Sequence, residues 1–172
     1  MPNRFTEGEI TSLVRRFFRA NDFNFLSTFS NGDKLYYTFD GNTLNNKQPD
    51  SIIFKNDLVI ICEDKIMFRS LYNANDKTKG DFSKLSRFLN SSIDLNIFKK
   101  KIKNLVNIEN VKIIGCLSSL ESKQESNNKS FISDNLMHLS IIESKAKTYK
   151  ITANIVEELH HYFTNQTIEF VI

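Results

Sequence analysis

The first hydrophobic positions of the chain recur with the spacing of an amphipathic helix. Thr6, followed three residues later by Glu9, is a typical capping signal at the start of a helix. The apolar stripe that follows consists of Ile10, Leu13, Val14, Phe17 and Phe18. This spacing of three and four residues predicts a helix that starts after Thr6 and ends near Asn21.

The next hydrophobic patterns change to those of β-strands. Strand-like patterns occupy residues 23–29, 34–39, 51–55 and 58–64. Asn31-Gly32-Asp33 is typical of a hairpin turn between the first two of them. Residues 40–48 are rich in Asn and are expected to form a loop. The run at 58–64 is mostly apolar, which favours a central strand that is covered on both faces.

The second half of the chain alternates helical and strand-like patterns. Helices are expected at 81–89, 95–105 and 152–163, and strands at 111–117, 136–142 and 167–172. The polar residues 118–134 are typical of a flexible insertion, and residues 70–80 of a loop. This order of elements predicts an α/β fold with a central mixed β-sheet flanked by helices.

Length and composition are those of an ordinary folded domain. The chain has 172 residues, of which 40% are hydrophobic and 25% charged. We expect a single domain over 1–172, with a core at about 6–117 and a C-terminal strand–helix–strand extension at about 135–172. Cys62 and Cys116 lie in apolar runs and are expected to be buried thiols. No apolar run approaches the ~20 residues that span a bilayer, which predicts a soluble cytoplasmic protein without a membrane partner.

Positive charge is concentrated in the middle of the chain. The net charge is +3, and residues 63–103 hold ten Lys or Arg against five Asp or Glu. This excess permits a nucleic-acid partner without demanding one. The candidate phosphate contacts are Arg69, Lys77, Lys79, Lys99, Lys100 and Lys101. The lysines at 99–101 are equally explained as the solvated face of a helix, so the loop at 69–79 is the better candidate.

Charged residues appear where the apolar part of the two central strands begins or ends. Asp50 precedes one strand, and Glu63 and Lys65 close the next. Alternate side chains of a strand share a face, so Glu63 and Lys65 project together while Asp64 faces away. If the strands are neighbours, Asp50 lies at the same edge. Two carboxylates can bind Mg²⁺ and a lysine can face a phosphate, which predicts a metal-dependent catalytic site of Asp50, Glu63 and Lys65.

Pro49-Asp50, twelve intervening residues and Glu63-Asp64-Lys65 resemble the PD-(D/E)xK signature of the restriction-endonuclease-like nucleases. The order of predicted elements over residues 6–117 is also similar to the core of that superfamily. The resemblance implies a restriction-endonuclease-like core, with Asp50 and Glu63 as metal ligands and Lys65 as the catalytic lysine. It implies Mg²⁺, for which Mn²⁺ can substitute, and hydrolysis of DNA phosphodiester bonds by a type II restriction-type or related DNA-processing endonuclease.

Glu9 has two competing roles, one implied by the resemblance and one by its place in the helix start. Many members place a glutamate on the first helix near the metal, and Glu9 matches it. The same residue is fully explained as part of the capping signal, and one carboxylate cannot easily serve both. We further expect a homodimer, because cutting both strands of duplex DNA favours two-fold symmetry.

Three alternatives stay open at this point. One is a non-catalytic nucleic-acid-binding or assembly subunit that keeps the nuclease fold. Another is an RNA endonuclease that uses the same site, since nothing in the pattern distinguishes ribose from deoxyribose. The third moves the site to Asp134, Glu143 and Lys145, which flank the strand at 136–142 with similar spacing. Separate substitution of Lys65 and Lys145 distinguishes the two sites.

Overall fold

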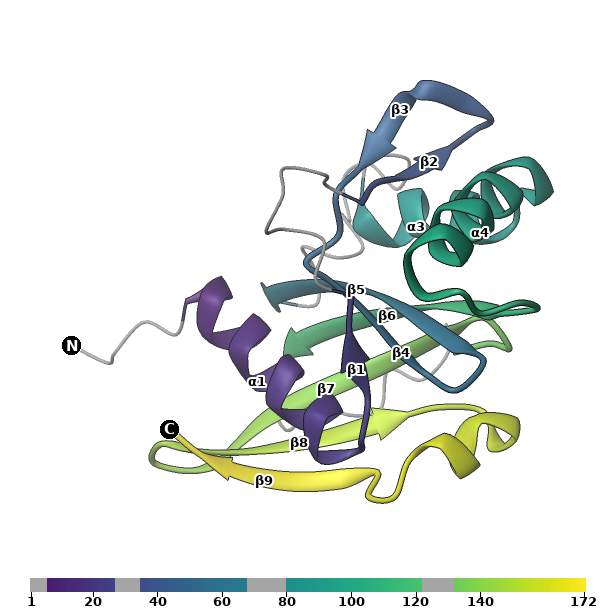
Figure 1. Cartoon of the computed structure of the whole chain (residues 1–172). Helices are drawn as coiled ribbons and strands as arrows, with labels where there is room; N and C mark the ends of the chain where they lie inside the picture. Colours follow the sequence, from purple (N-terminus) through teal and green to yellow (C-terminus); the bar gives the residue numbers. More distant parts are fainter. Residues whose placement is uncertain (1–5, 27–34, 68–79, 122–131) are drawn as a thin grey trace.

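A computed structural model of the chain describes residues 6–26, 35–67, 80–121 and 132–172. Within these residues seven strands form one mixed sheet in the order β1-β4-β5-β6-β7-β8-β9, and helices cover both of its faces (Figure 1). The central strands β5, β6 and β7 are parallel, and the other neighbours in the sheet are antiparallel. The expected α/β fold with a mixed central sheet is therefore confirmed.

The strands of the sheet are β1 (Asn24–Phe25), β4 (Ser51–Lys55), β5 (Leu58–Met67), β6 (Lys112–Leu120), β7 (Leu136–Lys145), β8 (Thr148–Asn154) and β9 (Thr167–Val171). A separate hairpin consists of β2 (Tyr37–Phe39) and β3 (Asn42–Lys47). The helices are α1 (Glu7–Ala20), α3 (Asp81–Leu89), α4 (Ser92–Val106) and a short 3-10 helix, η1 (Glu157–Tyr162). The C-terminal segment adds its three strands to the same sheet as the core.

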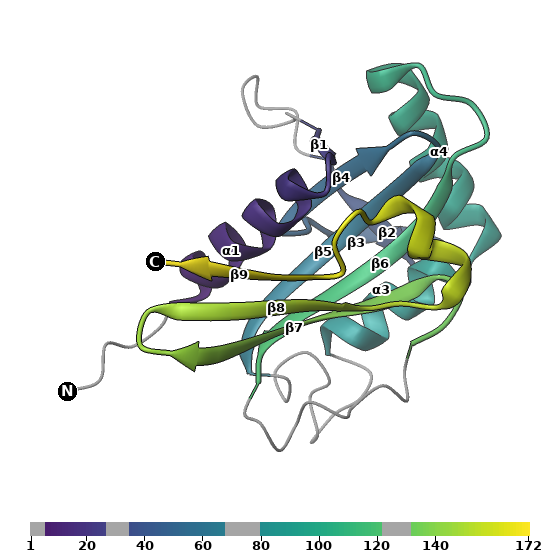
Figure 2. The same cartoon turned by 90° about the horizontal axis from the view of Figure 1, so that it is seen from below.

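Helix α1 forms as its sequence predicts and lies in the concave face of a curled sheet. The backbone N–H of Glu9 donates to the hydroxyl of Thr6 at 3.2 Å, which caps the first turn. The predicted apolar stripe is buried against alternate residues of the central strands. Strands β8 and β9 curl beneath the helix (Figure 2). Arg16 ties the two ends together, because it donates to the carbonyl of Val171 at 3.2 Å and lies over the ring of Phe170.

Helices α3 and α4 cover the opposite face. They pack on the other alternate residues of β5 and β6, among them Val59 and Ile61. Phe88 joins the layers, with its ring centroid 4.9 Å from that of Tyr37 and 5.4 Å from that of Phe98. The β2–β3 hairpin lies beside these helices (Figure 1). Because β5 is covered by helices on both faces, its residues 58–62 are all buried, as predicted for a central strand.

Gly115 in β6 lies directly against Leu85 of α3. A Cβ at this position would lie 2.5 Å from Cδ2 of Leu85 and 3.0 Å from Cδ1 of Leu136. We expect Gly115→Val to destabilise the protein by about 1–3 kcal/mol, because the helix must shift outward. Urea denaturation followed by circular dichroism measures the effect.

Gly8→Ala is the matched control, because its Cβ would meet only the Thr6 hydroxyl, at 3.8 Å. A helical Gly→Ala change without a clash is neutral or stabilises by up to about 1 kcal/mol. Equal unfolding midpoints for the two variants would contradict the tight packing of α3.

Two expected elements are wrong. Residues 40–48 do not form a loop, since β3 lies within them and pairs with β2 across a turn at Asp40-Gly41. Both turn residues have positive φ, which aspartate and glycine tolerate. The helix expected at 152–163 is instead the end of β8 followed by η1. Alternate burial along β8 shows that the strand period dominates there. The predicted turn at 31–33 lies outside the described residues.

Candidate active site

The antiparallel pairing of β4 and β5 brings the predicted acidic residues to one edge of the sheet. Ser51 pairs with Cys62, so the start of β4 lies beside the end of β5. The N–H of Asp50 donates to the carbonyl of Cys62 at 3.0 Å. In return, Oδ2 of Asp50 accepts the backbone N–H of Asp64 at 2.7 Å. Asp50 is thereby fixed next to the Glu63-Asp64-Lys65 segment.

The strand alternation distributes the three charged residues of β5 as predicted. Glu63 follows Val59 and Ile61 toward the face covered by α3 and α4, where it contacts Tyr37. Asp64 follows Ile60 toward the α1 face, where its Oδ2 accepts the Thr11 hydroxyl at 2.9 Å. The strand continues to Met67, so Lys65 also belongs to it. Acidic groups therefore lie on both sides of one strand end.

Both carboxylate oxygens of Glu63 accept hydrogen bonds in the interior. Its side chain is nearly inaccessible, with a residue exposure of 2%. Oε1 accepts the Tyr37 hydroxyl at 3.1 Å, and Oε2 accepts the ammonium of Lys47 at 3.1 Å. Burial raises the pKa of Glu63 to about 8, although the charge of Lys47 opposes the shift. Near neutral pH the protonated form of this carboxyl group is therefore favoured.

Lys47 joins Glu63 to a second carboxylate that sequence analysis does not identify. Its ammonium also forms an ion pair with Asp81, the first residue of α3. Burial lowers the pKa of Lys47, but Glu63 and Asp81 outweigh it and raise the pKa overall. Lys47 is therefore a cation held between two acids, at the end of β3.

Lys65 connects the two helical layers across the site. Its Nζ lies 3.3 Å from Oε1 of Glu7 in α1 and 3.8 Å from Oδ2 of Asp81 in α3. Partial burial lowers the pKa of Lys65, but these carboxylates outweigh it and raise the pKa overall. The lysine remains charged at neutral pH and is held at the edge beside Asp50.

Asp64, which is buried, and Asp50, which is half-buried, add two further carboxyl groups. Burial raises the pKa of Asp64 to about 7, and the charge of Asp50 adds to the shift. Burial likewise raises the pKa of Asp50, while the N–H of Asp64 lowers it. Four acids around two lysines are thus held in a region that disfavours uncompensated negative charge. Such perturbed groups are typical of functional sites.

The donor set suits a hard divalent cation. Carboxylate oxygens are the ligands that Mg²⁺ prefers, and Oδ1 of Asp64 is buried without a hydrogen bond among the described residues. Lys47 already occupies a cationic position between Glu63 and Asp81. In the part of the chain that the structure describes, no three His, Cys, Asp or Glu side chains converge as a ready metal site. A cation would therefore compete with the lysine.

Glu9 does not join the acids, and Glu7 reaches the site in its place. Oε1 of Glu9 accepts the hydroxyl of Thr6 at 3.3 Å, and its charge acts on Tyr149 in β8. Two residues correspond to about 200° around a helix, so Glu7 and Glu9 point in nearly opposite directions. The capping role of Glu9 accounts for its position, and the structure gives no support to Glu9 as a metal ligand.

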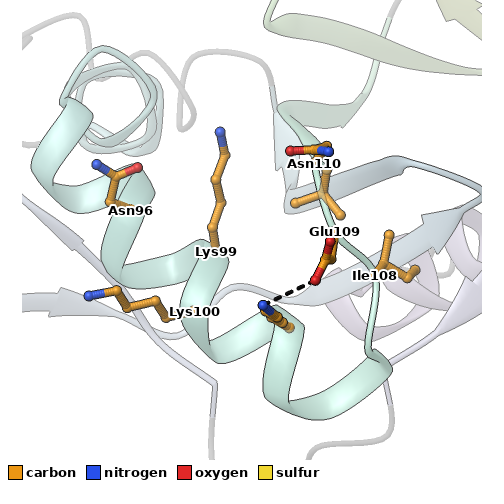
Figure 3. A pocket seen from close by; sticks show the side chains of 8 residues that line it. Asn96, Lys99, Lys100, Ile108, Glu109 and Asn110 are labelled. Atoms are coloured by element: carbon orange, nitrogen blue, oxygen red, sulfur yellow. Dashed lines mark ion pairs between the residues drawn. The ribbon is translucent and has the colours of Figure 1, made fainter.

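The predicted phosphate contacts that the structure describes, Lys99, Lys100 and Lys101, are not gathered at the site. Lys99 and Lys100 are exposed and line a separate pocket of about 450 Å³ beside Asn110 (Figure 3). That pocket lies near the start of β6, whereas the acids lie near the ends of β5 and β6. The ammonium of Lys101 donates to the carbonyl of Tyr36 at 3.4 Å. Arg69, Lys77 and Lys79 lie outside the described residues.

The competing site at Asp134, Glu143 and Lys145 is wrong, because these residues lie at opposite ends of β7. Asp134 precedes β7, and Glu143 and Lys145 lie at its far end. The extended residues 136–143 alone separate the start of β7 from Glu143 by about 23 Å. All three residues are exposed, and no single ion contacts both ends.

Among the described residues no helix is long and apolar enough to cross a membrane. In comparisons with known proteins, no protein-family model, no curated protein and no solved structure matches this chain.

Proposed function

We propose that this chain is a Mg²⁺-dependent DNA endonuclease with a restriction-endonuclease-like core, which acts as a homodimer of the type II restriction or a related DNA-processing type. The observation that carries the proposal is the pairing of β4 with β5, which holds Asp50 against Glu63-Asp64 with Lys65 beside them. The order of elements also supports it. Helix α1, strands β4 and β5, two helices and the parallel strand β6 follow in the order that the resemblance implies for the nuclease core.

The residues divide into those that would hold the cation and those that would act on the phosphate. Asp50 and Glu63 would hold Mg²⁺, or Mn²⁺ in its place, with Lys47 displaced from Glu63. The cation supplies an activated water and neutralises charge on the phosphate. Lys65 orients the attacking water or stabilises charge that develops on phosphate oxygens. Asp81 and Glu7 position Lys65, since both lie within ion-pair distance of its ammonium.

Incubation with supercoiled plasmid tests the proposal. We expect nicking or linearisation in Mg²⁺ and in Mn²⁺, and none in EDTA. Lys65→Ala should slow cutting by about 100-fold, the scale for loss of one charge-stabilising donor. Lys145→Ala should cut at the parental rate, because Lys145 is exposed at the far end of β7.

The same experiment separates the alternatives. DNA binding without cutting in either metal would favour a non-catalytic subunit. Cutting of single-stranded RNA but not of DNA would favour an RNA endonuclease. Equal cutting by Lys65→Ala and the parent would point to a contaminating nuclease and remove the support for this site.

A further inference from the structure

A polar cleft runs along α1 beside the acidic residues. It has a volume of about 610 Å³ and is closed at one side by Asp50. The helix contributes Glu7, Gly8, Thr11, Ser12, Arg15 and Arg19. These positions recur every three or four residues and form the face of α1 that is turned away from its buried stripe. The cleft and the acidic site therefore share Asp50 and Glu7.

Arg15 is fixed in this cleft by neutral oxygens rather than by an acid. Its Nε donates to the hydroxyl of Ser51 at 3.0 Å, and its Nη2 donates to the carbonyl of Asp50 at 3.0 Å. Within the described residues no carboxylate lies within ion-pair distance of it. The charge of Arg15 also acts on the buried Asp64. Its two hydrogen bonds to neutral oxygens orient the guanidinium and leave other N–H donors suited to bind a phosphate. One of its two partners, Asp50, immediately precedes β4 and is a proposed metal ligand.

Arg19 repeats this charge one helical turn farther from the acids. It is exposed and its guanidinium lies 4.7 Å from the centre of the Phe25 ring, which holds the side chain against β1. Four residues of helix advance by about 6 Å, which is close to the separation of neighbouring phosphates along one strand. Arg15 and Arg19 therefore form a short positive line that leads away from Asp50.

Two acids, Glu7 and Asp50, line the cleft, and the charge of Lys65 acts on both of them. Glu7 is paired with Lys65 at 3.3 Å, so its charge is locally balanced. Gly8 lacks a side chain there, and a Cβ at that position would meet only the Thr6 hydroxyl. The backbone of α1 is thus approachable from the cleft. By contrast, Lys99 and Lys100 lie near the opposite end of the central strands.

We propose that the α1 cleft binds the phosphodiester backbone of the DNA strand to be cut, with Arg15 and Arg19 on successive phosphates. This inference rests on the proposed function. It places substrate phosphates next to the shared Asp50 and assigns strand binding to α1 instead of the lysine-rich α4. Because the contacts are to phosphates, the binding has no sequence preference of its own.

Fluorescence anisotropy with a labelled DNA duplex, in EDTA at several salt concentrations, tests the inference without cleavage. Arg19→Gln should weaken binding by about fivefold. The negative slope of the logarithm of the association constant against the logarithm of the salt concentration should become shallower by about 0.9, as expected for one lost phosphate contact. Arg15→Gln should act in the same direction. The double variant Lys99→Gln/Lys100→Gln is the matched control and should bind as the parent does.

The outcomes keep this inference separate from the proposed function. Parental affinity and salt slope in Arg19→Gln and Arg15→Gln would overturn the α1 cleft, even if plasmid is cut. Equal losses in the α4 control, or binding of RNA only, would overturn it as well. Loss of DNA binding confined to the α1 variants supports the cleft, even if no cleavage is found. Circular dichroism of Arg15→Gln excludes unfolding as the cause, and the exposed Arg19 provides the variant that keeps the fold.

Discussion

Replacement of Glu63 by glutamine is expected to reduce metal-dependent DNA cleavage by at least about 1,000-fold without destabilising the protein at pH 8. Glutamine has the same shape and keeps both contacts, because its oxygen can accept from Lys47 and its amide can donate to the Tyr37 oxygen. It cannot supply the anionic ligand that would hold Mg²⁺. Activity and stability should therefore separate in this one variant.

The pH dependence of the parent protein's stability shows whether Glu63→Gln stabilises or destabilises the fold. The pKa of Glu63 is raised from 4.5 to about 8 by burial, so the folded protein prefers the protonated form. Its favourable contribution is complete below about pH 4.5 and is lost as pH rises through 8. Shifts of this size correspond to a few kcal/mol, at about 1.4 kcal/mol for each pH unit. Glu63→Gln should remove that loss.

Urea denaturation at pH 6.0 and pH 8.5 measures the difference. We expect Glu63→Gln to gain stability relative to the parent between the two values, while a smaller slope from Asp64 remains, because its pKa is raised to about 7. Glu143→Gln, at an exposed position of β7, should follow the parent at both pH values. A variant that loses stability relative to the parent at pH 8.5, or that still cuts DNA, would refute this account of Glu63.

Lys47→Met should destabilise the metal-free protein and increase its response to divalent cations. The substitution leaves Glu63 and Asp81 without the cation that joins them. Breaking a buried ion pair from one side costs 3–5 kcal/mol. Because the side chain of Lys47 is 20% exposed, we expect about 2–3 kcal/mol. A divalent cation would then compensate the two acids more strongly than in the parent.

Thermal unfolding in EDTA, Mg²⁺ and Mn²⁺ follows both effects. The midpoint of Lys47→Met should fall in EDTA and rise on addition of metal by more than the midpoint of the parent. Lys150→Met, at an exposed position of β8, is the control and should show neither change. A parental midpoint in EDTA would mean that Lys47 does not hold the acids. An unchanged response to metal would argue against a cation that takes the place of Lys47 beside Glu63.

The strand pair at the site can be predicted because strands have strong local rules. A continuous apolar run identifies β5 as central, and the two-residue period then fixes the opposite directions of Glu63 and Asp64. The neighbouring position of Asp50 follows from the short turn between β4 and β5. These contacts are local in sequence, so no knowledge of the remaining fold is needed.

The residues that sequence analysis misses reach the site only through tertiary packing. Lys47 lies in a segment whose asparagine content favours a loop. The segment instead forms β3, and Lys47 at its end lies beside Glu63. Asp81 depends on where α3 begins relative to β5. Glu7 rather than Glu9 reaches the site because it lies on the side of α1 that faces the end of β5. The apolar stripe of the helix does not by itself show which polar side that is. The expected helix at 152–163 fails for a similar reason, since the position of β8 beside β7 outweighs local propensity.

The curl of the sheet has a consequence for the order of assembly. Strand β9 closes the trough in which α1 lies, and Arg16 fastens the helix to the carbonyl of Val171. A nascent chain that has not yet released residues 167–171 leaves the first helix partly uncovered. Arg16 then lacks its contacts with Phe170 and Val171. The burial of the first helix is thereby completed only after β9 has joined the sheet.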